Sequence, residues 1–89
     1  MKKIKLFKLK YCPYCVQALK YVQEFIEMNP AYAALDIEII DEGEERKRAA
    51  QYDYYYVPTF YLDTVKVHEG AVTRQQVGMI LEQALEGDT

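Results

Sequence analysis

Cys12-Pro13-Tyr14-Cys15 places two thiols two residues apart, at a point where an extended segment is expected to turn into a helix. The preceding residues 3–9 are rich in apolar side chains and are typical of a buried strand. After the motif, apolar side chains that include Val16 recur at helical spacing over residues 16–26. The two thiols are therefore predicted to lie at the N-terminus of a helix.

A thiol at that position is expected to ionise easily, because the first N–H groups of a helix have no internal partner and the helix dipole is positive there. Cys12 would occupy the cap position, and Pro13 the first helical position, where a missing N–H is harmless. Lys8 and Lys10 should lower the pKa of Cys12 further. Cys12 is therefore the predicted attacking thiolate, and Cys15, which turns inward, the predicted resolving thiol.

Two other uses are open to such a pair of cysteines, a buried structural pair and one half of a zinc site. Zinc takes about four ligands, whereas the chain holds two cysteines and a single histidine, His68, in a distant strand-like stretch. The count favours redox chemistry. The alternative function is a homodimeric metal module, in which two copies pool the thiolates of Cys12 and Cys15 around zinc or an iron–sulfur cluster.

The composition indicates one small folded domain over residues 1–89. Hydrophobic residues make up 51% and charged residues 28% of the chain, and the formal net charge of −3 gives no case for nucleic-acid binding. No segment approaches the roughly 18 consecutive apolar residues of a membrane span, and the lysine-rich start lacks a cleavage site. We expect a monomeric cytoplasmic protein without a membrane partner, in a compartment that keeps such thiols mostly reduced.

The hydrophobic pattern predicts the element order β-α-β-α-β-β-α. Strands are expected at residues 3–9, 36–41, 57–62 and 65–68, with Asp63-Thr64 as the turn between the last two. Helices are expected at residues 13–28, at residues 44–52 and after Thr73, which forms a capping box with Gln76; residues 31–35 could add a helical turn. The first two strands run parallel if the helix between them is a crossover. The fold class is α/β, with one four-stranded mixed sheet and helices on both faces.

Tyr11-Cys12-Pro13-Tyr14-Cys15 and Val57-Pro58 resemble the corresponding motifs of the glutaredoxins, a family with the thioredoxin fold. The resemblance spans nearly the full length and implies a thioredoxin-like fold. It also implies that Pro58 is in cis beside the two cysteines, and that the backbone of Val57 pairs with a substrate as an added strand. From the residues alone, a purely structural role for Pro58 at the start of a strand is as well supported as a functional one, because proline cannot donate to a sheet ladder.

Three places differ from the glutaredoxin pattern around glutathione. Tyr56 replaces a usual threonine, Leu9 a usual basic residue, and Glu69-Gly70-Ala71 a usual Gly-Gly pair, so that Glu69 would bring negative charge toward an anionic ligand. Residues 70–74, followed by a closing helix, resemble the end of a thioredoxin instead. A glutathione site is therefore disfavoured, although glutathione and a thioredoxin-reductase-type enzyme are the two candidate electron donors.

These observations predict a thiol-disulfide oxidoreductase with no bound cofactor. Cys12 would attack a protein or small-molecule disulfide, and Cys15 would resolve the mixed disulfide. Of the three tyrosines at 54–56, at least one could line the substrate groove, although a place in the core is equally open. The residues expected to contact the substrate are Pro13, Tyr14, Tyr56, Val57 and Pro58.

Overall fold

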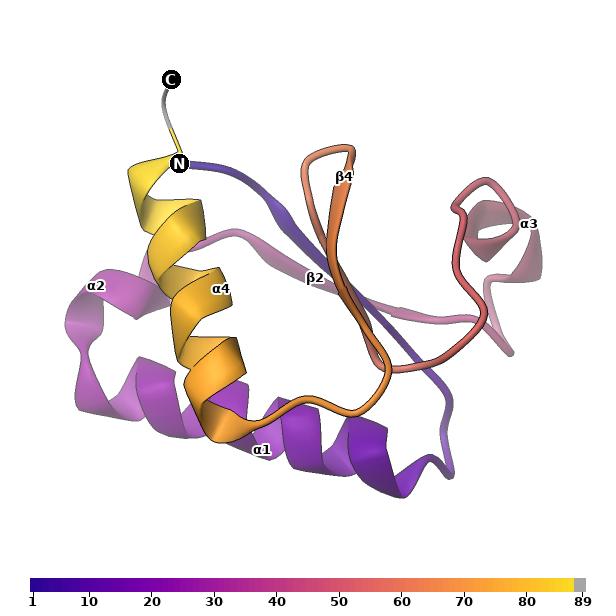
Figure 1. Ribbon diagram of the computed structural model, residues 1–89, viewed down its shortest axis with the longest axis horizontal. Coiled ribbons are helices and arrows are strands. Elements are labelled where there is room, and N and C mark those ends of the chain that lie inside the picture. Colours follow the sequence, from indigo (N-terminus) through magenta and orange to yellow (C-terminus); the bar gives the residue numbers. More distant parts are fainter. Residues whose placement is uncertain (88–89) are drawn as a thin grey trace.

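Four strands form one mixed sheet in the order β2-β1-β3-β4 in the computed structural model, which describes residues 1–87 (Figure 1). β1 pairs in parallel with β2 and antiparallel with β3, and β3 pairs antiparallel with β4. The strands are β1 (Ile4–Lys8), β2 (Ile37–Asp41), β3 (Thr59–Leu62) and β4 (Val65–Glu69). The helices are α1 (Pro13–Met28), α2 (Pro30–Ala33), α3 (Arg46–Ala49) and α4 (Arg74–Glu86). The predicted sheet is confirmed.

Helices cover both faces of the sheet, because the strands alternate their apolar side chains between two cores. Ile4 and Leu6 of β1 belong to the larger core, together with the inner faces of α1 and α4. Phe7 points to the opposite face and packs in a smaller core with Ile40 and with Ala49 of α3. Figure 1 shows α1 and α4 close together, with α3 well apart from them.

α1 begins and ends where its sequence predicts. Cys12 is the N-cap residue and Pro13 the first helical residue. The helix ends at Met28, and Asn29 then caps α2 by accepting a 3.0 Å hydrogen bond from the N–H of Ala31. One expectation for its inner face is wrong, since Val16 is 60% exposed and the buried positions are Cys15, Ala18 and Val22.

α3 is much shorter than the predicted helix over residues 44–52. The N–H groups of Glu44 and Glu45 both donate to the carbonyl oxygen of Asp41, which forms a turn where the first helical residues were expected. The side chain of the cap residue Glu45 makes no capping hydrogen bond and instead lies 3.6 Å from Nη1 of Arg48. Beyond α3, the ring of Tyr52 packs 4.8 Å from that of Phe7 and draws the chain back toward the sheet.

Other boundaries differ from the sequence-based expectation by one or two residues. β3 begins at Thr59 rather than at residue 57, because Pro58 has no N–H with which to enter the ladder. β1 ends at Lys8, so Leu9 lies outside the strand and is exposed. α2 begins one residue early, at Pro30, because Asn29 caps it there.

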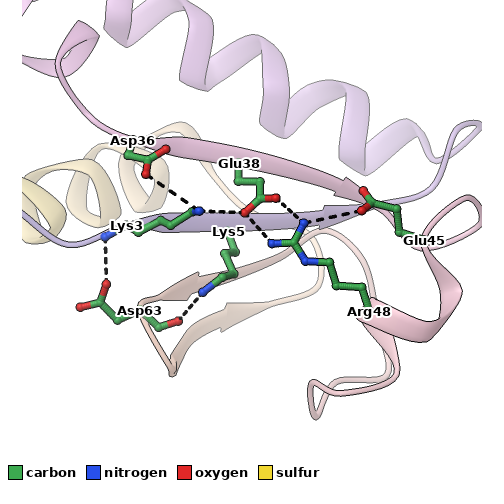
Figure 2. A network of polar contacts seen from close by, with 7 residues as sticks. All are labelled: Lys3, Lys5, Asp36, Glu38, Glu45, Arg48 and Asp63. Atoms are coloured by element: carbon green, nitrogen blue, oxygen red, sulfur yellow. Dashed lines mark hydrogen bonds and ion pairs between the residues drawn. The ribbon is translucent and has the colours of Figure 1, made fainter.

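A polar network holds α3 to the sheet (Figure 2). Arg48 makes a two-pronged contact with the carboxylate of Glu38 on β2, in which Nη2 donates to Oε1 over 2.7 Å and Nη1 donates to Oε2. Lys3 contacts the same carboxylate at 3.0 Å from the other side. Two-pronged arginine–carboxylate pairs are among the stronger polar contacts. The network therefore supplements the single buried side chain of this short helix, Ala49.

α4 begins at a complete capping box. The hydroxyl oxygen of Thr73 accepts a 3.1 Å hydrogen bond from the N–H of Gln76, whose side chain accepts the N–H of Thr73 over 2.9 Å. Gly78 then allows α4 to pack close to α1, since a Cβ atom there would lie 2.9 Å from the ring of Phe25. Among residues 1–87, no helix is both long and apolar enough to cross a bilayer.

The strand directions bring distant residues to one edge of the sheet. β1, β2 and β4 end at this edge, and β3 begins there; the register pairs Lys8 with Asp41, and Thr59 with Glu69. Cys12 follows β1, while Val57 and Pro58 lead into β3. The edge therefore gathers the two sequence motifs that were singled out, although they are far apart in the chain.

Candidate active site

The two cysteines lie in different environments at the start of α1. Cys12 is partly exposed, and its Sγ accepts a 3.1 Å hydrogen bond from the backbone N–H of Cys15. Cys15 is only 1% exposed. Both are free thiols. The predicted difference between an accessible first sulfur and an enclosed second one is thus present.

Burial keeps the second thiol protonated. It raises the pKa of Cys15 to about 12, and a hydrogen bond with Cys12 acts in the same direction. A buried thiolate is disfavoured because it loses its hydration. At neutral pH, Cys15 is therefore a neutral thiol that becomes a nucleophile only when its proton is removed.

Val57 and Pro58 lie directly beside Cys12. The Cys12 thiol donates a hydrogen bond to the carbonyl oxygen of Val57, with 3.8 Å between Sγ and oxygen. The Val57–Pro58 peptide bond is cis, as the family resemblance implies. The carbonyl oxygen of Pro58 accepts a 2.8 Å hydrogen bond from the N–H of Gly70. The approach to β3 therefore forms one wall of the site.

The comparisons with known proteins agree with this arrangement. A family model described as a thioredoxin domain matches residues 2–82. The chain belongs to this thioredoxin-domain family. The solution structure of oxidised thioredoxin from Plasmodium falciparum has the same fold, with a TM-score of 0.69 and 19% sequence identity over 90% of this chain and 77% of that chain. No curated protein sequence gives a significant match. The predicted thioredoxin-like fold is confirmed.

The two lysines before the motif of this thioredoxin domain have other partners. Lys8 forms a 3.5 Å ion pair with Asp41 at the end of β2. Lys10 places its ammonium group 5.7 Å from the centre of the Tyr11 ring. Neither contact involves Cys12, so the predicted effect of the lysines on that thiol stays a prediction.

The three consecutive tyrosines have two different roles in the thioredoxin domain. Tyr54 is partly buried and packs against the smaller core, because its ring lies 4.9 Å from that of Phe7 and its hydroxyl donates to Glu42 over 3.0 Å. Tyr55 and Tyr56 are 87% and 71% exposed. Tyr14, two residues after Cys12 in the chain, is also exposed. Tyr54 thus has the structural role that the sequence left open, and a place for Tyr56 in the substrate groove stays a prediction.

An open cleft of about 460 Å³ adjoins Cys12. Its walls are mostly apolar, and its lining residues are Leu9, Lys10, Tyr11, Cys12, Asp41, Gly43 and Glu44. The sequence did not indicate this cleft, because Leu9 was expected inside a strand and the loop after β2 was expected to be helical. The available signal in the sequence was the aliphatic residue Leu9, three positions before Cys12.

The structure gives Glu69 partners that the sequence did not indicate. Its carboxylate accepts the N–H groups of Tyr55 and Tyr56 and pairs with Lys66, and its predicted effect against an anionic ligand stays a prediction. These contacts, led by the one with Lys66, lower the pKa of Glu69 to about 2. Its charge is therefore balanced within the protein, beside Val57.

The described part of the thioredoxin domain brings together no group of three or more histidine, cysteine or acidic residues suited to a metal ion. One copy offers Cys12 and Cys15 as sulfur ligands. The alternative metal module would therefore need the thiolates of a second copy, and it stays a prediction.

Proposed function

We propose that the protein is a thiol-disulfide oxidoreductase that reduces disulfides of protein substrates by dithiol exchange. The observation that carries this proposal is the asymmetry of the two cysteines. Cys12 is partly exposed at the cap of α1 beside Val57, whereas Cys15 is enclosed one helical turn further on. An accessible sulfur can capture a disulfide, and an enclosed one can displace the product without meeting large partners.

The exchange proceeds in two steps. The Cys12 thiolate attacks one sulfur of the substrate disulfide, the substrate S–S bond breaks, and the departing sulfur keeps the electron pair and leaves as a thiolate. Cys15 then loses its proton and attacks Sγ of Cys12, which releases the second substrate thiolate. The protein ends with a Cys12–Cys15 disulfide, and the substrate has gained two electrons.

The hydrogen bond between the two cysteines favours Cys12 as the attacking thiolate and later as the leaving group when the protein is reduced again. The N–H of Cys15 points at Sγ of Cys12 at the positive end of α1, so it stabilises negative charge on that sulfur. The same charge develops again when Cys12 leaves the internal disulfide during reduction of the protein. The neutral state of Cys15, whose pKa is about 12, delays the second step until a base takes its proton. The departing substrate thiolate can serve as this base.

The surroundings of Cys12 favour an extended polypeptide as substrate. The N–H of Val57 has no hydrogen-bond partner within residues 1–87, which leaves it free to pair with an added strand. The apolar cleft on the Leu9 side can receive a side chain that flanks the substrate cysteine. Tyr14 and Tyr56 present exposed rings on which such a segment can pack. A protein disulfide uses all of these features, whereas a small disulfide uses few.

Glutathione and a thioredoxin-reductase-type enzyme remain the two proposed electron donors. The position where glutaredoxins usually have a basic residue is Leu9, whose side chain lines the apolar cleft. An apolar wall offers no counter-charge to the carboxylates of glutathione. The proposal therefore favours reduction by a reductase over reduction by glutathione.

The test is reduction of insulin, followed by its precipitation, with dithiothreitol as the first electron source. The expected result is faster precipitation with the wild type, and background rates with Cys12→Ser and Cys15→Ser. Repeating the assay with glutathione and glutathione reductase, or with thioredoxin reductase and NADPH, separates the donors. A wild-type rate equal to that of Cys12→Ser would contradict the proposal.

A further inference from the structure

The carboxylate of Glu69 receives three donors from two parts of the chain. Its Oε2 atom accepts the backbone N–H of Tyr55 over 2.5 Å and that of Tyr56 over 3.0 Å. Its Oε1 atom accepts the ammonium group of Lys66 over 2.6 Å. Glu69 is the last residue of β4, so these bonds tie the loop before β3 to the sheet.

The next residue continues this attachment. Gly70 donates its N–H to the carbonyl oxygen of Pro58 over 2.8 Å, from a backbone with φ of 91° that favours glycine. On the other side, the hydroxyl of Thr59 donates to the carbonyl oxygen of Tyr56 over 2.5 Å. The segment at residues 55–58 is thus held at both ends, with Val57 between the two attachments.

These bonds determine which donors remain for a substrate. Tyr55 and Tyr56 give their N–H groups to Glu69, and Pro58 has none. Of residues 55–58, Val57 is the one whose N–H has no partner among the described residues 1–87. An extended peptide can therefore pair with the segment at one position, directly beside the Cys12 sulfur.

We propose that Glu69 is a positioning residue that fixes the register in which an extended substrate pairs with Val57. This inference rests on the proposed function. It assigns a role to a residue outside both sequence motifs, and it gives the charge of Glu69 a purpose other than repulsion of anions. The low pKa of Glu69, about 2, agrees with a carboxylate that stays charged and bonded at any physiological pH.

Three variants separate the contacts. Glu69→Ala removes all acceptors and frees the N–H groups of Tyr55 and Tyr56. Glu69→Gln keeps one carbonyl oxygen for the two N–H groups but removes the charge. Lys66→Met is the matched control, because it removes the ion pair and leaves the carboxylate with its two backbone donors.

The variants are compared on two mixed disulfides that share thionitrobenzoate as the coloured leaving group. In one compound it is joined to the cysteine of a short extended peptide, and in the other to mercaptoethanol. We expect Glu69→Ala to lower the rate constant for the peptide compound about tenfold, and that for the small compound less than about twofold. Glu69→Gln should restore most of the peptide rate, and Lys66→Met should react like the wild type.

Amide hydrogen exchange, followed by NMR, gives a readout that does not require activity. The amides of Tyr55 and Tyr56 should exchange faster in Glu69→Ala than in the wild type, and at the wild-type rate in Lys66→Met. Unchanged exchange, or an equal fall of both rate constants, would overturn the role of Glu69. A wild type that releases thionitrobenzoate from neither compound would instead overturn the proposed function, while the exchange data would still test the attachment.

Discussion

The Sγ atom of Cys12 lies 3.8 Å from the carbonyl oxygen of Val57, a residue 45 positions further along the chain. The contact exists because the end of β1 and the start of β3 share one edge of the sheet. It places the accessible thiol against the backbone of a segment that has a free N–H. Chemistry and substrate pairing thus meet at a single point.

Tyr54 should be the structural member of the tyrosine triplet. Its partly buried ring packs against the smaller core beside Phe7, so Tyr54→Ala should lower the free energy of unfolding by about 2 kcal/mol. Tyr56→Ala should change it by less than about 0.5 kcal/mol, because that side chain is exposed. Urea unfolding measures both values. The prediction fails if the two variants are equally destabilised.

Tyr56 should instead matter for peptide substrates. Its exposed ring precedes Val57, so Tyr56→Ala should raise KM for a peptide disulfide about threefold and leave kcat nearly unchanged. Steady-state kinetics on one peptide series supplies both constants. A fall in kcat at constant KM would assign Tyr56 a role in the reaction itself rather than in binding.

Cys15 should react more slowly with alkylating agents than Cys12. Burial raises the pKa of Cys15 to about 12, and the thiolate is the form that reacts. Iodoacetamide at pH 8 should therefore modify Cys12 at least about tenfold faster in the folded protein. Peptide mapping by mass spectrometry gives the order. Equal modification of both cysteines without unfolding would contradict the enclosed position of Cys15.

The raised pKa of Cys15 also predicts alkaline destabilisation. The folded state holds this proton more tightly than the unfolded chain, so the stabilising contribution is complete below about pH 9 and is lost as the pH rises toward 12. Cys15→Ala should show a shallower fall in the free energy of unfolding over this interval. A part of the slope should remain, since burial also raises the pKa of Tyr54. Identical slopes would refute the prediction.

Glu38 should make the fold sensitive to acid. Hydrogen bonds from Arg48 and then Lys3 lower the pKa of Glu38 to about 2, so its contribution is complete above about pH 4.5 and is lost as the pH falls through 2. Glu38→Gln should cost about 1 kcal/mol at pH 7 and flatten this decline. Glu27→Gln, on the exposed side of α1, is the control. Urea unfolding at pH 7 and at pH 3 tests both, and an unchanged acid slope in Glu38→Gln would count against the network.

The capping box of α4 offers a simpler test of stability. Thr73→Ala removes the hydroxyl that accepts the N–H of Gln76, and it should lower the free energy of unfolding by about 1 kcal/mol. Gln75→Ala changes an exposed neighbour in the same turn and should stay within about 0.5 kcal/mol of the wild type. Thermal unfolding followed by circular dichroism compares them. Equal melting temperatures for the two variants would rule out the cap as a source of stability.

Local patterns were enough to predict much of the fold. The cap at Cys12, the end of α1 before Pro30 and the capping box at Thr73 each depend on residues close together in the chain, and the structure confirms all of them. The apolar faces of the expected strands and helices together predicted a sheet covered on both faces. These features follow from backbone hydrogen bonding and side-chain periodicity, which sequence displays directly.

The features that the sequence did not indicate depend on contacts between distant segments. The extent of α3 was wrong, because the carbonyl group of Asp41 takes the N–H groups expected in its first turn. The bonds from Tyr55 and Tyr56 to Glu69 arise only when β3 and β4 pair. The cleft beside Leu9 likewise needs the loop after β2. None of these has a local pattern of its own.

The most direct measurement is intact-protein mass spectrometry of Cys15→Ser after mixing with a peptide disulfide. We expect a stable adduct of one peptide per chain, joined to Cys12 and removed by dithiothreitol. Cys12→Ser under the same conditions should stay unmodified, because its remaining thiol is enclosed. Absence of an adduct on Cys15→Ser, or equally rapid adduct formation on Cys12→Ser, would contradict the assignment of the two sulfurs.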